Sequence, residues 1–290
     1  MEKALKKYSP LFVIPTFAAF VIGFIIPFAE GLYLSFCQFT TVKNAKWVGF
    51  SNYQRVFADE TFSNALGFTV SYAVVSIVVI NVIALGLALL LTRNLKGTNI
   101  FRTIFFMPNL IGGIVLGYIW SMIFDGILTH FGTSILMDST FGFWGLIILM
   151  CWQQVGYMMI IYIAGLQAVP EDILEAAKID GATKTQTLFR VIIPNVMPSI
   201  TICTFLSLTN GFKLFDQNLA LTGGQPFIIQ PDGSSIKTTE MLALNIFNTF
   251  YGSNSASSGQ AQAKAVLFFI LVASIGLIQL GITRKREVQQ

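Results

Sequence analysis

Long apolar runs, separated by shorter polar segments, divide this chain into six candidate membrane spans. A helix needs roughly 20 mostly apolar residues to cross a bilayer, and the runs close to or above this length are 11–36, 68–91, 107–124, 143–165, 194–215 and 263–282. The first run is longer than the apolar core of a signal peptide, about 7–15 residues, so we expect it to be retained. The pattern predicts an all-α membrane protein with six transmembrane helices.

The polar segments between the runs suggest how the chain is divided. Residues 1–66 hold an N-terminal tail, the first span and an outer segment, and residues 67–290 form a core domain with five spans. In the outer segment, Gly49 to Tyr53 followed by Val56 and Phe57 is typical of a short amphipathic helix, although an ordinary surface loop fits the pattern equally well. A second long outer segment, 217–262, is rich in turn residues.

A charged segment at 170–193 interrupts the apolar pattern between the fourth and fifth runs. Pro170 is suited to a first helical position, and Glu171 and Asp172 are favourable at the positive end of a helix. The spacing predicts a helix with Ile173, Leu174 and Ala177 on one side. Gly181 supplies a helix end, and Thr183 with Gln186 has the spacing of a capping box for a second helix. The segment is therefore predicted to be a helix–turn–helix at the membrane surface.

This segment resembles the EAA loop of permeases from binding-protein-dependent ABC importers. The matching residues are Glu175, Ala176, Ala177, Gly181 and Pro194, whereas Val191 and Ile193 stand where the family has Ile and Leu. The resemblance implies a type I ABC importer permease fold, in which a cytoplasmic coupling helix docks into a cleft of an ATPase subunit. The residues that it assigns to this coupling role are Glu175, Ala176, Ala177, Asp180 and Gly181.

A second match lies after the fifth run. Phe215-Asp216, followed by Leu221-Thr222-Gly223-Gly224-Gln225-Pro226, is similar to the FD…TGGGP stretch of sugar importers, with Gln225 replacing a glycine. The chain is most similar to the maltose-type first permease subunit of the carbohydrate uptake branch. The resemblance implies a complex with a second homologous permease, two cytoplasmic ATPase subunits, an external substrate-binding protein and a sugar substrate. It also implies ATP-driven alternating access.

The distribution of Lys and Arg along the chain indicates how the spans are oriented in the membrane. Charged residues make up 11% of the sequence, against roughly 25% in soluble domains, as expected for a protein in a lipid bilayer. Twelve of the 18 Lys and Arg residues fall in the segments on the side of the N-terminus. The positive-inside rule then places both termini and 170–193 in the cytoplasm of a prokaryotic cell. Membrane topology thus explains the basic residues behind the net charge of +4, and we expect no nucleic-acid partner.

The sequence carries little that suggests catalysis. It lacks the GxxxxGK[ST] phosphate loop, so we expect a partner ATPase to bind ATP and Mg, and no cofactor or metal in this chain. His130 stands alone in a predicted outer loop. Asp172 and Glu175 resemble a metal-binding carboxylate pair, but helix capping and docking already explain them. Cys37, Cys151 and Cys203 lie in apolar segments, so we expect free buried thiols.

Polar residues within spans are the candidates for a substrate path, because polar groups in a bilayer are costly unless they line a cavity or pair with each other. The candidate cavity residues are Gln153, Gln154, Tyr157, Asn210, Gly211, Lys213, Trp120 and Ser121. For Gln153, Tyr157 and Asn210, helix packing is an equal alternative. Lys213 and Asp216 have the spacing to neutralise each other, and Asn81 has the character of an interhelical hydrogen-bonding residue.

Neutral amides, hydroxyls and aromatic rings suit an uncharged polyhydroxyl ligand. We therefore predict a transmembrane permease subunit that translocates a sugar, most simply an oligosaccharide. The alternatives are a permease for another solute such as glycerol phosphate, or an ion-coupled secondary transporter. A membrane-embedded transferase or protease is disfavoured because the chain lacks clustered histidines and carboxylates.

Overall fold

The computed structural model describes residues 13–93, 96–231, 233–252 and 257–284. Within them the chain forms two compact units, one of residues 1–59 with 246–270 and one of residues 60–245 with 271–290. The predicted boundary at residue 66 therefore falls inside a helix. The predicted division also missed that 246–270 joins the N-terminal unit. Lys3, Lys6 and Lys7 of the N-terminal tail lie outside the described residues.

Unit 1 contains the first apolar helix and a small polar platform. Residues Val13–Leu34 are helical, with a π-helical segment η1 (Val21–Ile25) followed by α2 (Ile26–Leu34). The platform consists of β1 (Cys37–Gln38), η2 (Val42–Asn44), β2 (Lys46–Trp47) and α3 (Ser51–Phe57), with β1 and β2 antiparallel. The predicted short helix is thus present, but it begins at Ser51, and Gly49 and Phe50 form the turn before it.

Side chains remote in sequence hold unit 1 together. The buried Asn52 donates hydrogen bonds from Nδ2 to the carbonyls of Ser35 and Cys37, both at 2.9 Å. Lys264, on the first part of α14 (Ser257–Arg284), forms an ion pair with Asp59 at 2.7 Å and donates to Thr249 at 2.9 Å. Lys264 is one of the six Lys and Arg residues that the charge count left outside the cytoplasmic segments, where it was counted as an outer cation, but it is 1% exposed.

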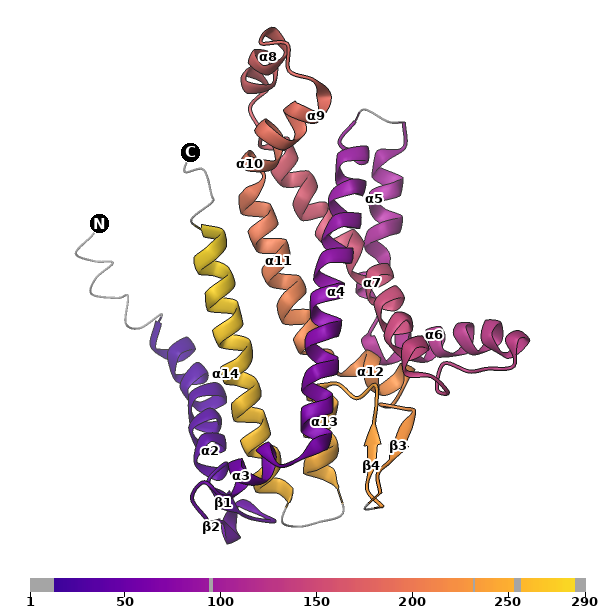
Figure 1. The fold of residues 1–290 in the computed structure, drawn as a ribbon. Helices are drawn as coiled ribbons and strands as arrows, with labels where there is room; N and C mark the ends of the chain where they lie inside the picture. The colour runs from indigo at the N-terminus through magenta and orange to yellow at the C-terminus, as the bar shows by residue number, and fades with distance from the viewer. Residues whose placement is uncertain (1–12, 94–95, 232, 253–256, 285–290) are drawn as a thin grey trace, which may run out of the picture. The chain divides into compact units, whose positions relative to one another are not determined.

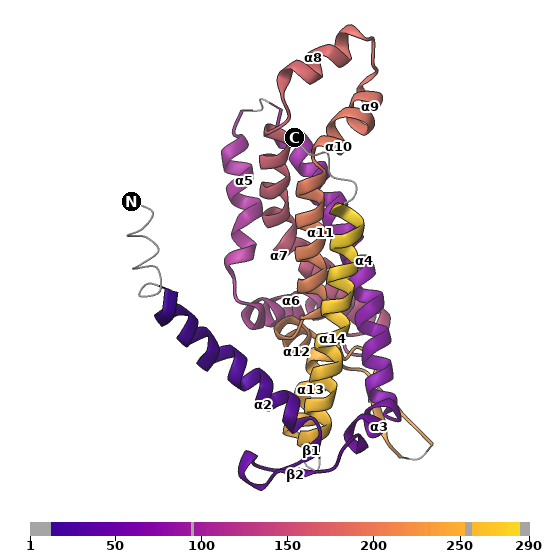
Figure 2. The same ribbon diagram turned by 90° about the vertical axis from the view of Figure 1, so that its left-hand side faces the viewer.

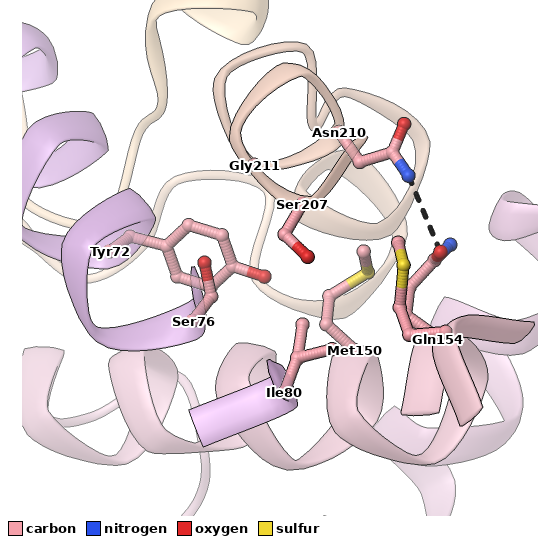
Figure 3. A pocket seen from close by; sticks show the side chains of 9 residues that line it. Tyr72, Ser76, Ile80, Met150, Gln154, Ser207, Asn210 and Gly211 are labelled. Carbon is pink, nitrogen blue, oxygen red and sulfur yellow. Dashed lines mark hydrogen bonds between the residues drawn. The ribbon is translucent and has the colours of Figure 1, made fainter. Parts of the chain in front are cut away.

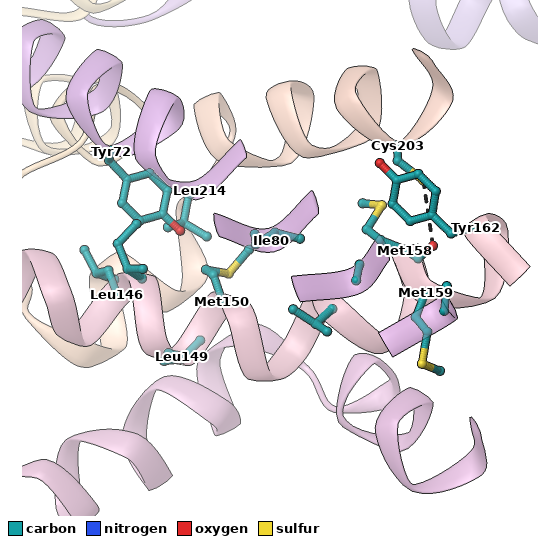
Figure 4. Close-up of a cluster of buried hydrophobic side chains, with 14 of the residues drawn as sticks. Tyr72, Ile80, Leu146, Leu149, Met150, Met158, Met159, Tyr162, Cys203 and Leu214 are labelled. Atoms are coloured by element: carbon teal, nitrogen blue, oxygen red, sulfur yellow. Dashed lines mark hydrogen bonds between the residues drawn. The ribbon is translucent and has the colours of Figure 1, made fainter. Parts of the chain in front are cut away.

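Unit 2 is a helical bundle whose long members are α4 (Glu60–Leu91), α7 (Ser139–Gln167) and α11 (Met197–Phe212). Its core lies where these three helices meet, as Figure 4 shows for residues such as Tyr72, Ile80, Met150, Met158 and Cys203. In a bilayer, helices associate through close packing more than through exclusion of water. Small residues serve this purpose here: Ala84 and Ala88 of α4 are fully buried.

The predicted third span is broken. A helix α5 (Thr98–Phe106) is followed by η3 (Met107–Leu110) and then by α6 (Gly113–Leu128). Figure 1 shows α5 alongside α4 and α7, whereas α6 lies across them. Pro108 lies in the first turn of η3, at the break, and α5 packs closely on α7 just before it, since a Cβ added at Gly156 would overlap the backbone of Phe105. Hydropathy is continuous through this segment and therefore did not reveal the break.

The remaining elements close the two ends of unit 2. One end carries α8 (Glu171–Ile179), α9 (Lys184–Thr187), η5 (Leu188–Ile192) and α10 (Ile193–Asn195), and the other carries α12 (Asp216–Leu221) with the antiparallel strands β3 (Phe227–Ile229) and β4 (Ser235–Lys237). A short η4 (Thr129–Phe131) follows α6, and α13 (Leu242–Tyr251) leads into unit 1.

Five or six of the helices fit the predicted membrane spans in length and composition. Five are long and apolar enough to cross a membrane: Val13–Leu34, Glu60–Leu91, Gly113–Phe131, Ser139–Gln167 and Ser258–Thr283. A sixth span is reached when the bent pair Lys184–Asn195 and Met197–Phe212, whose two parts meet at 69°, is counted as one. The long part of this pair, α11, lies within the fifth predicted span, 194–215.

Candidate functional site

The polar hairpin at one end of unit 2 has the local structure that its sequence predicts, with one difference. Helix α8 begins at Glu171, with Pro170 as its N-cap and not as a first helical residue. Glu171 and Asp172 occupy the first turn and Lys178 the last, each at the end where its charge is favourable. These charges favour the helix from within its own sequence.

The turn between α8 and α9 is fixed by its backbone. Gly181 has φ of +73°, a conformation that other residues rarely adopt. The amide of Ala182 donates to the Ala177 carbonyl at 3.0 Å. Thr183 and Gln186 then form the predicted capping box, in which the Thr183 amide donates to Gln186 Oε1 at 2.8 Å and the Gln186 amide donates to Thr183 Oγ1 at 3.3 Å. The hairpin is thus a defined helix–turn–helix.

Helix α8 carries two apolar strips, of which the structure buries one. Ala177 is 8% exposed, and Leu174 packs against the core. Ile173 was predicted to share this side, but it is 40% exposed, and Ile179 is 87% exposed. Ile173, Ala176 and Ile179 are three residues apart and so follow one another along the other side of the helix. Glu175, Asp180 and Gly181 are also exposed, so most of the predicted coupling residues are accessible.

The hairpin connects two long helices, α7 and α11, that pack closely where they reach it. Residue Gly165, near the end of α7, lies against α11 so closely that an added Cβ would be 2.9 Å from Ser199 Cβ and 3.4 Å from Val196 Cγ1. Val196 is buried and marks the 69° bend before α11. Helix α8 also contacts η5, which continues into that bend. The hairpin thus lies where α7 and α11 are in close contact.

A polar crevice lies between α4, α7 and α11 in the interior of unit 2. Figure 3 shows Tyr72, Ser76, Gln154, Ser207 and Asn210 turned toward it, with Gly211 beside them. Two predicted candidates meet here, since Asn210 Nδ2 donates to Gln154 Oε1 at 3.3 Å. The side chains fill the crevice, so this unit alone leaves no room for a sugar at that point.

Gln153 has a different position from its neighbour Gln154. It is 5% exposed, its Nε2 donates to the Ile111 carbonyl at 3.1 Å, and its Oε1 accepts from Gln217 Nε2 at 2.8 Å. The Ile111 carbonyl can accept this hydrogen bond because Ile111 lies in the break between η3 and α6. The structure thus uses Gln153 to join α7 to the α5–α6 break and to α12, which favours packing over cavity lining.

The other predicted cavity residues are dispersed. Tyr157 is half-buried against the core, and Trp120 stacks edge-on with Trp152 at 5.8 Å between ring centres, with Ser121 half-buried beside it. None of these three lines the crevice. Lys213 is exposed at the end of α11, and among the described residues it forms no ion pair with Asp216.

A buried hydrogen-bond chain beside the crevice was largely missed. Tyr162 Oη donates to Asn81 Oδ1 at 2.7 Å, and Asn81 Nδ2 donates to Ser207 Oγ at 3.0 Å, which links α7, α4 and α11. Asn81 therefore has the interhelical role considered for it. Tyr72 and Ser76 were also missed, although their four-residue spacing places them on one helix face.

Among the described residues there is no group of three His, Cys, Asp or Glu side chains that could hold a metal ion. His130 is exposed, and its Nδ1 is 2.9 Å from the Gly126 carbonyl. Cys37 and Cys203 are buried and free, and Cys151 is half-buried and free.

Comparisons with known proteins agree with this arrangement. Residues 80–287 match the family described as "Binding-protein-dependent transport system inner membrane component". The chain is 42% identical to the probable starch degradation products transport system permease protein AmyD of Thermoanaerobacterium thermosulfurigenes, over 96% of this chain and 94% of that protein. It is 32% identical to the multiple sugar-binding transport system permease protein MsmF of Streptococcus mutans, over 99% of both.

A solved structure shows the same fold. The match is to a chain of a bacterial ABC transporter involved in the import of the acidic polysaccharide alginate, with a TM-score of 0.79, 20% identity and coverage of 98% of both chains. A further crystal structure of an alginate ABC transporter, with a TM-score of 0.78 and 20% identity, is of a complex with an alginate-bound periplasmic protein and matches 98% of this chain and 97% of that chain.

Proposed function

The chain belongs to the family of binding-protein-dependent transport system inner membrane components, and we propose that it is a permease subunit that translocates an oligosaccharide in an ATP-driven importer. The observation that carries this proposal is the α8–α9 hairpin. It projects from the end of the bundle, exposes Ile173 and Ile179, and connects α7 to α11, two helices that contact each other at Gly165 and Ser199.

The hairpin supports a coupling role because it combines an uncovered surface with a rigid base. In our proposal, the Ile173–Ala176–Ile179 strip, with Glu175 and Asp180 at its borders, docks into an ATPase subunit. That subunit binds ATP and Mg, which this chain has no motif to hold. Closure of two such subunits displaces α8, and the displacement rotates the ends of α7 and α11 together. The result is alternating access by rigid-body motion of the spans.

The proposed substrate path runs beside the crevice of Gln154 and Asn210. Both side chains are neutral amides that match sugar hydroxyl groups, and each is half-buried. Because the crevice is filled, we propose that the path is completed by a second, homologous permease at the exposed side of these helices. The names of the relatives, which refer to starch degradation products and multiple sugars, support an oligosaccharide.

We also propose the orientation. The hairpin contains Lys178, Lys184 and Arg190, so it belongs in the cytoplasm by the positive-inside rule. The same rule places both termini there and α12 with the β3–β4 hairpin on the outer side of a prokaryotic inner membrane. An external substrate-binding protein then meets the permease at the α12 end.

Reconstitution tests this function. The chain, its second permease and an ATPase subunit are assembled in lipid vesicles, with the substrate-binding protein on the outer side, and uptake of labelled oligosaccharides is measured with and without ATP. We expect uptake only with the ATPase and ATP. Uptake by this chain alone, driven by an ion gradient, would contradict the proposal. Mass spectrometry of sugar retained by the intact assembly identifies the substrate, and retained glycerol phosphate would refute the oligosaccharide.

A further inference from the structure

The β3–β4 hairpin exposes an apolar strand. Side chains alternate between the two faces of a strand, yet Phe227, Ile228 and Ile229 are 53%, 57% and 78% exposed. Ile236, which pairs with Ile228 in the register, is buried. Packing within unit 2 thus buries Ile236 of β4 but leaves the side chains on both faces of β3 exposed. In the described part of the chain β4 is the one strand paired with β3, so the other edge of β3 is free.

The base of this hairpin is held firmly. Asn218 of α12 is fully buried, donates to the Thr239 carbonyl at 2.8 Å and accepts from the Met241 amide at 3.0 Å. Thr239 Oγ1 donates to the Gln225 carbonyl at 2.6 Å, and Asn64 of α4 donates to the Lys237 carbonyl at 2.9 Å. The strand is therefore presented in one orientation, which lowers the entropic cost of binding a partner.

The same base connects the hairpin to the spans. Gly117 of α6 lies against α12, because an added Cβ would be 2.6 Å from Ala220 Cβ. Gln217 of α12 donates to Gln153, which in turn holds the Ile111 carbonyl at the α5–α6 break. A force on the hairpin thus reaches α7 through α12, at the end opposite α8.

We propose that the Phe227–Ile229 strand is a docking surface for the external substrate-binding protein. This inference rests on the proposed function, which places the strand outside the membrane. Lipid is a poor occupant, because a free strand edge leaves backbone groups without hydrogen bonds in hydrocarbon. The surface has the composition of a protein interface, with an apolar centre and polar neighbours such as Lys237 and the Gln230–Glu60 pair. The family itself is described as dependent on a binding protein.

The test uses the intact importer in lipid nanodiscs and its own sugar-loaded binding protein. We expect Ile229→Asp and Phe227→Asp to weaken binding at least about ten-fold, as for a central interface residue, with basal ATP hydrolysis unchanged. Met137→Asp is the matched control, because Met137 is 68% exposed just before α7 and lies outside the hairpin. It should change the dissociation constant less than about two-fold.

Unchanged affinity in both hairpin variants, while the wild-type importer is still stimulated by its binding protein, overturns the docking surface and leaves the proposed function intact. Loss of the second permease from either variant also overturns it, since the strand then belongs to a permease–permease contact. A wild-type importer that no binding protein stimulates contradicts the proposed function itself.

Discussion

Gly165 of α7 and Ser199 of α11 are in such close contact that a single methyl group added at Gly165 would overlap the serine side chain, with its carbon 2.9 Å from Ser199 Cβ. This contact lies where both helices approach the exposed hairpin. Our proposal uses this contact to turn the ends of α7 and α11 together when α8 moves.

The first prediction concerns this contact. Gly165→Ala should destabilise the assembled complex by about 1–3 kcal/mol, the usual cost of overpacking, and should reduce substrate-stimulated ATP hydrolysis. Thermal unfolding of the purified complex and its stimulated ATPase rate measure the two effects. Adding Ser199→Gly removes the overlapping atoms and should restore most of both.

Gly86→Ala is the matched control for the first prediction. Gly86 lies in the interior of α4, and an added Cβ there would meet no atom within 4 Å. Alanine is the better helix former, so this variant should be neutral or slightly stabilising. If Gly165→Ala were equally neutral, the two helix ends would not be packed as described.

The second prediction concerns the turn of the hairpin. Gly181→Leu forces a bulky side chain into positive φ, at roughly 1–2 kcal/mol, and re-aims α8 relative to α9. We expect normal membrane insertion with transport and stimulated ATPase activity lost. Gly97→Leu provides the control, because Gly97 also has positive φ, at +84°, but lies outside the hairpin. Equal loss in both variants would point to general misfolding.

Glu175→Lys tests the surface of the hairpin without strain. Glu175 is exposed on α8, so its replacement should leave folding unchanged while placing the opposite charge at the border of the docking strip. We expect stable assembly of the two permeases but no substrate-stimulated ATP hydrolysis. Full activity would remove Glu175 from the docking surface.

Two asparagines allow sugar recognition to be separated from packing. Asn210→Leu should alter the KM for sugars, or the preference among them, with little change in assembly. Asn81→Leu should instead lower the melting temperature, because Tyr162 and Ser207 lose their partner, a loss of about 0.6–1.7 kcal/mol in a membrane protein. Uptake kinetics across a series of oligosaccharides, with thermal unfolding, distinguish the two. Unchanged kinetics for Asn210→Leu would exclude it from the path.

The buried ion pair of unit 1 gives the next prediction. Lys264→Met leaves Asp59 without its charged partner and should cost about 3–5 kcal/mol. The double variant with Asp59→Leu removes both charges and should recover much of that stability. Thermal unfolding measures both, and a single variant as stable as the wild type would show that the pair contributes nothing to the fold.

The features that the sequence predicted depend on neighbours along the chain. The capping box joins Thr183 to Gln186, three positions further along the chain, and the turn before it depends on the positive φ of Gly181 itself. The sequence therefore predicted both features at the correct positions. Long apolar runs likewise predicted the spans. The same local reasoning identified the polar residues Gln154 and Asn210, which the fold brings together from 56 residues apart.

The features that the sequence did not predict depend on distant partners. Gln153 binds Ile111 and Gln217, and only the folded chain reveals these contacts. The close approach of Gly156 to the backbone of Phe105, just before the α5–α6 break, is likewise a contact that hydropathy does not reveal. Lys264 was counted as an outer cation because the sequence does not reveal its ion pair with Asp59, which lies far away along the chain.

Site-specific crosslinking tests the central claim most directly. Ile179 is the suitable position, because it is 87% exposed whereas Ala177 on the same helix is 8% exposed. A cysteine at Ile179, with the three native cysteines replaced by alanine, should be crosslinked to an ATPase subunit in intact cells. A cysteine at Met137, beyond the opposite end of the bundle, should not. If the Ile179 cysteine reacts freely with a soluble thiol reagent but never captures an ATPase subunit, the hairpin is not the coupling element.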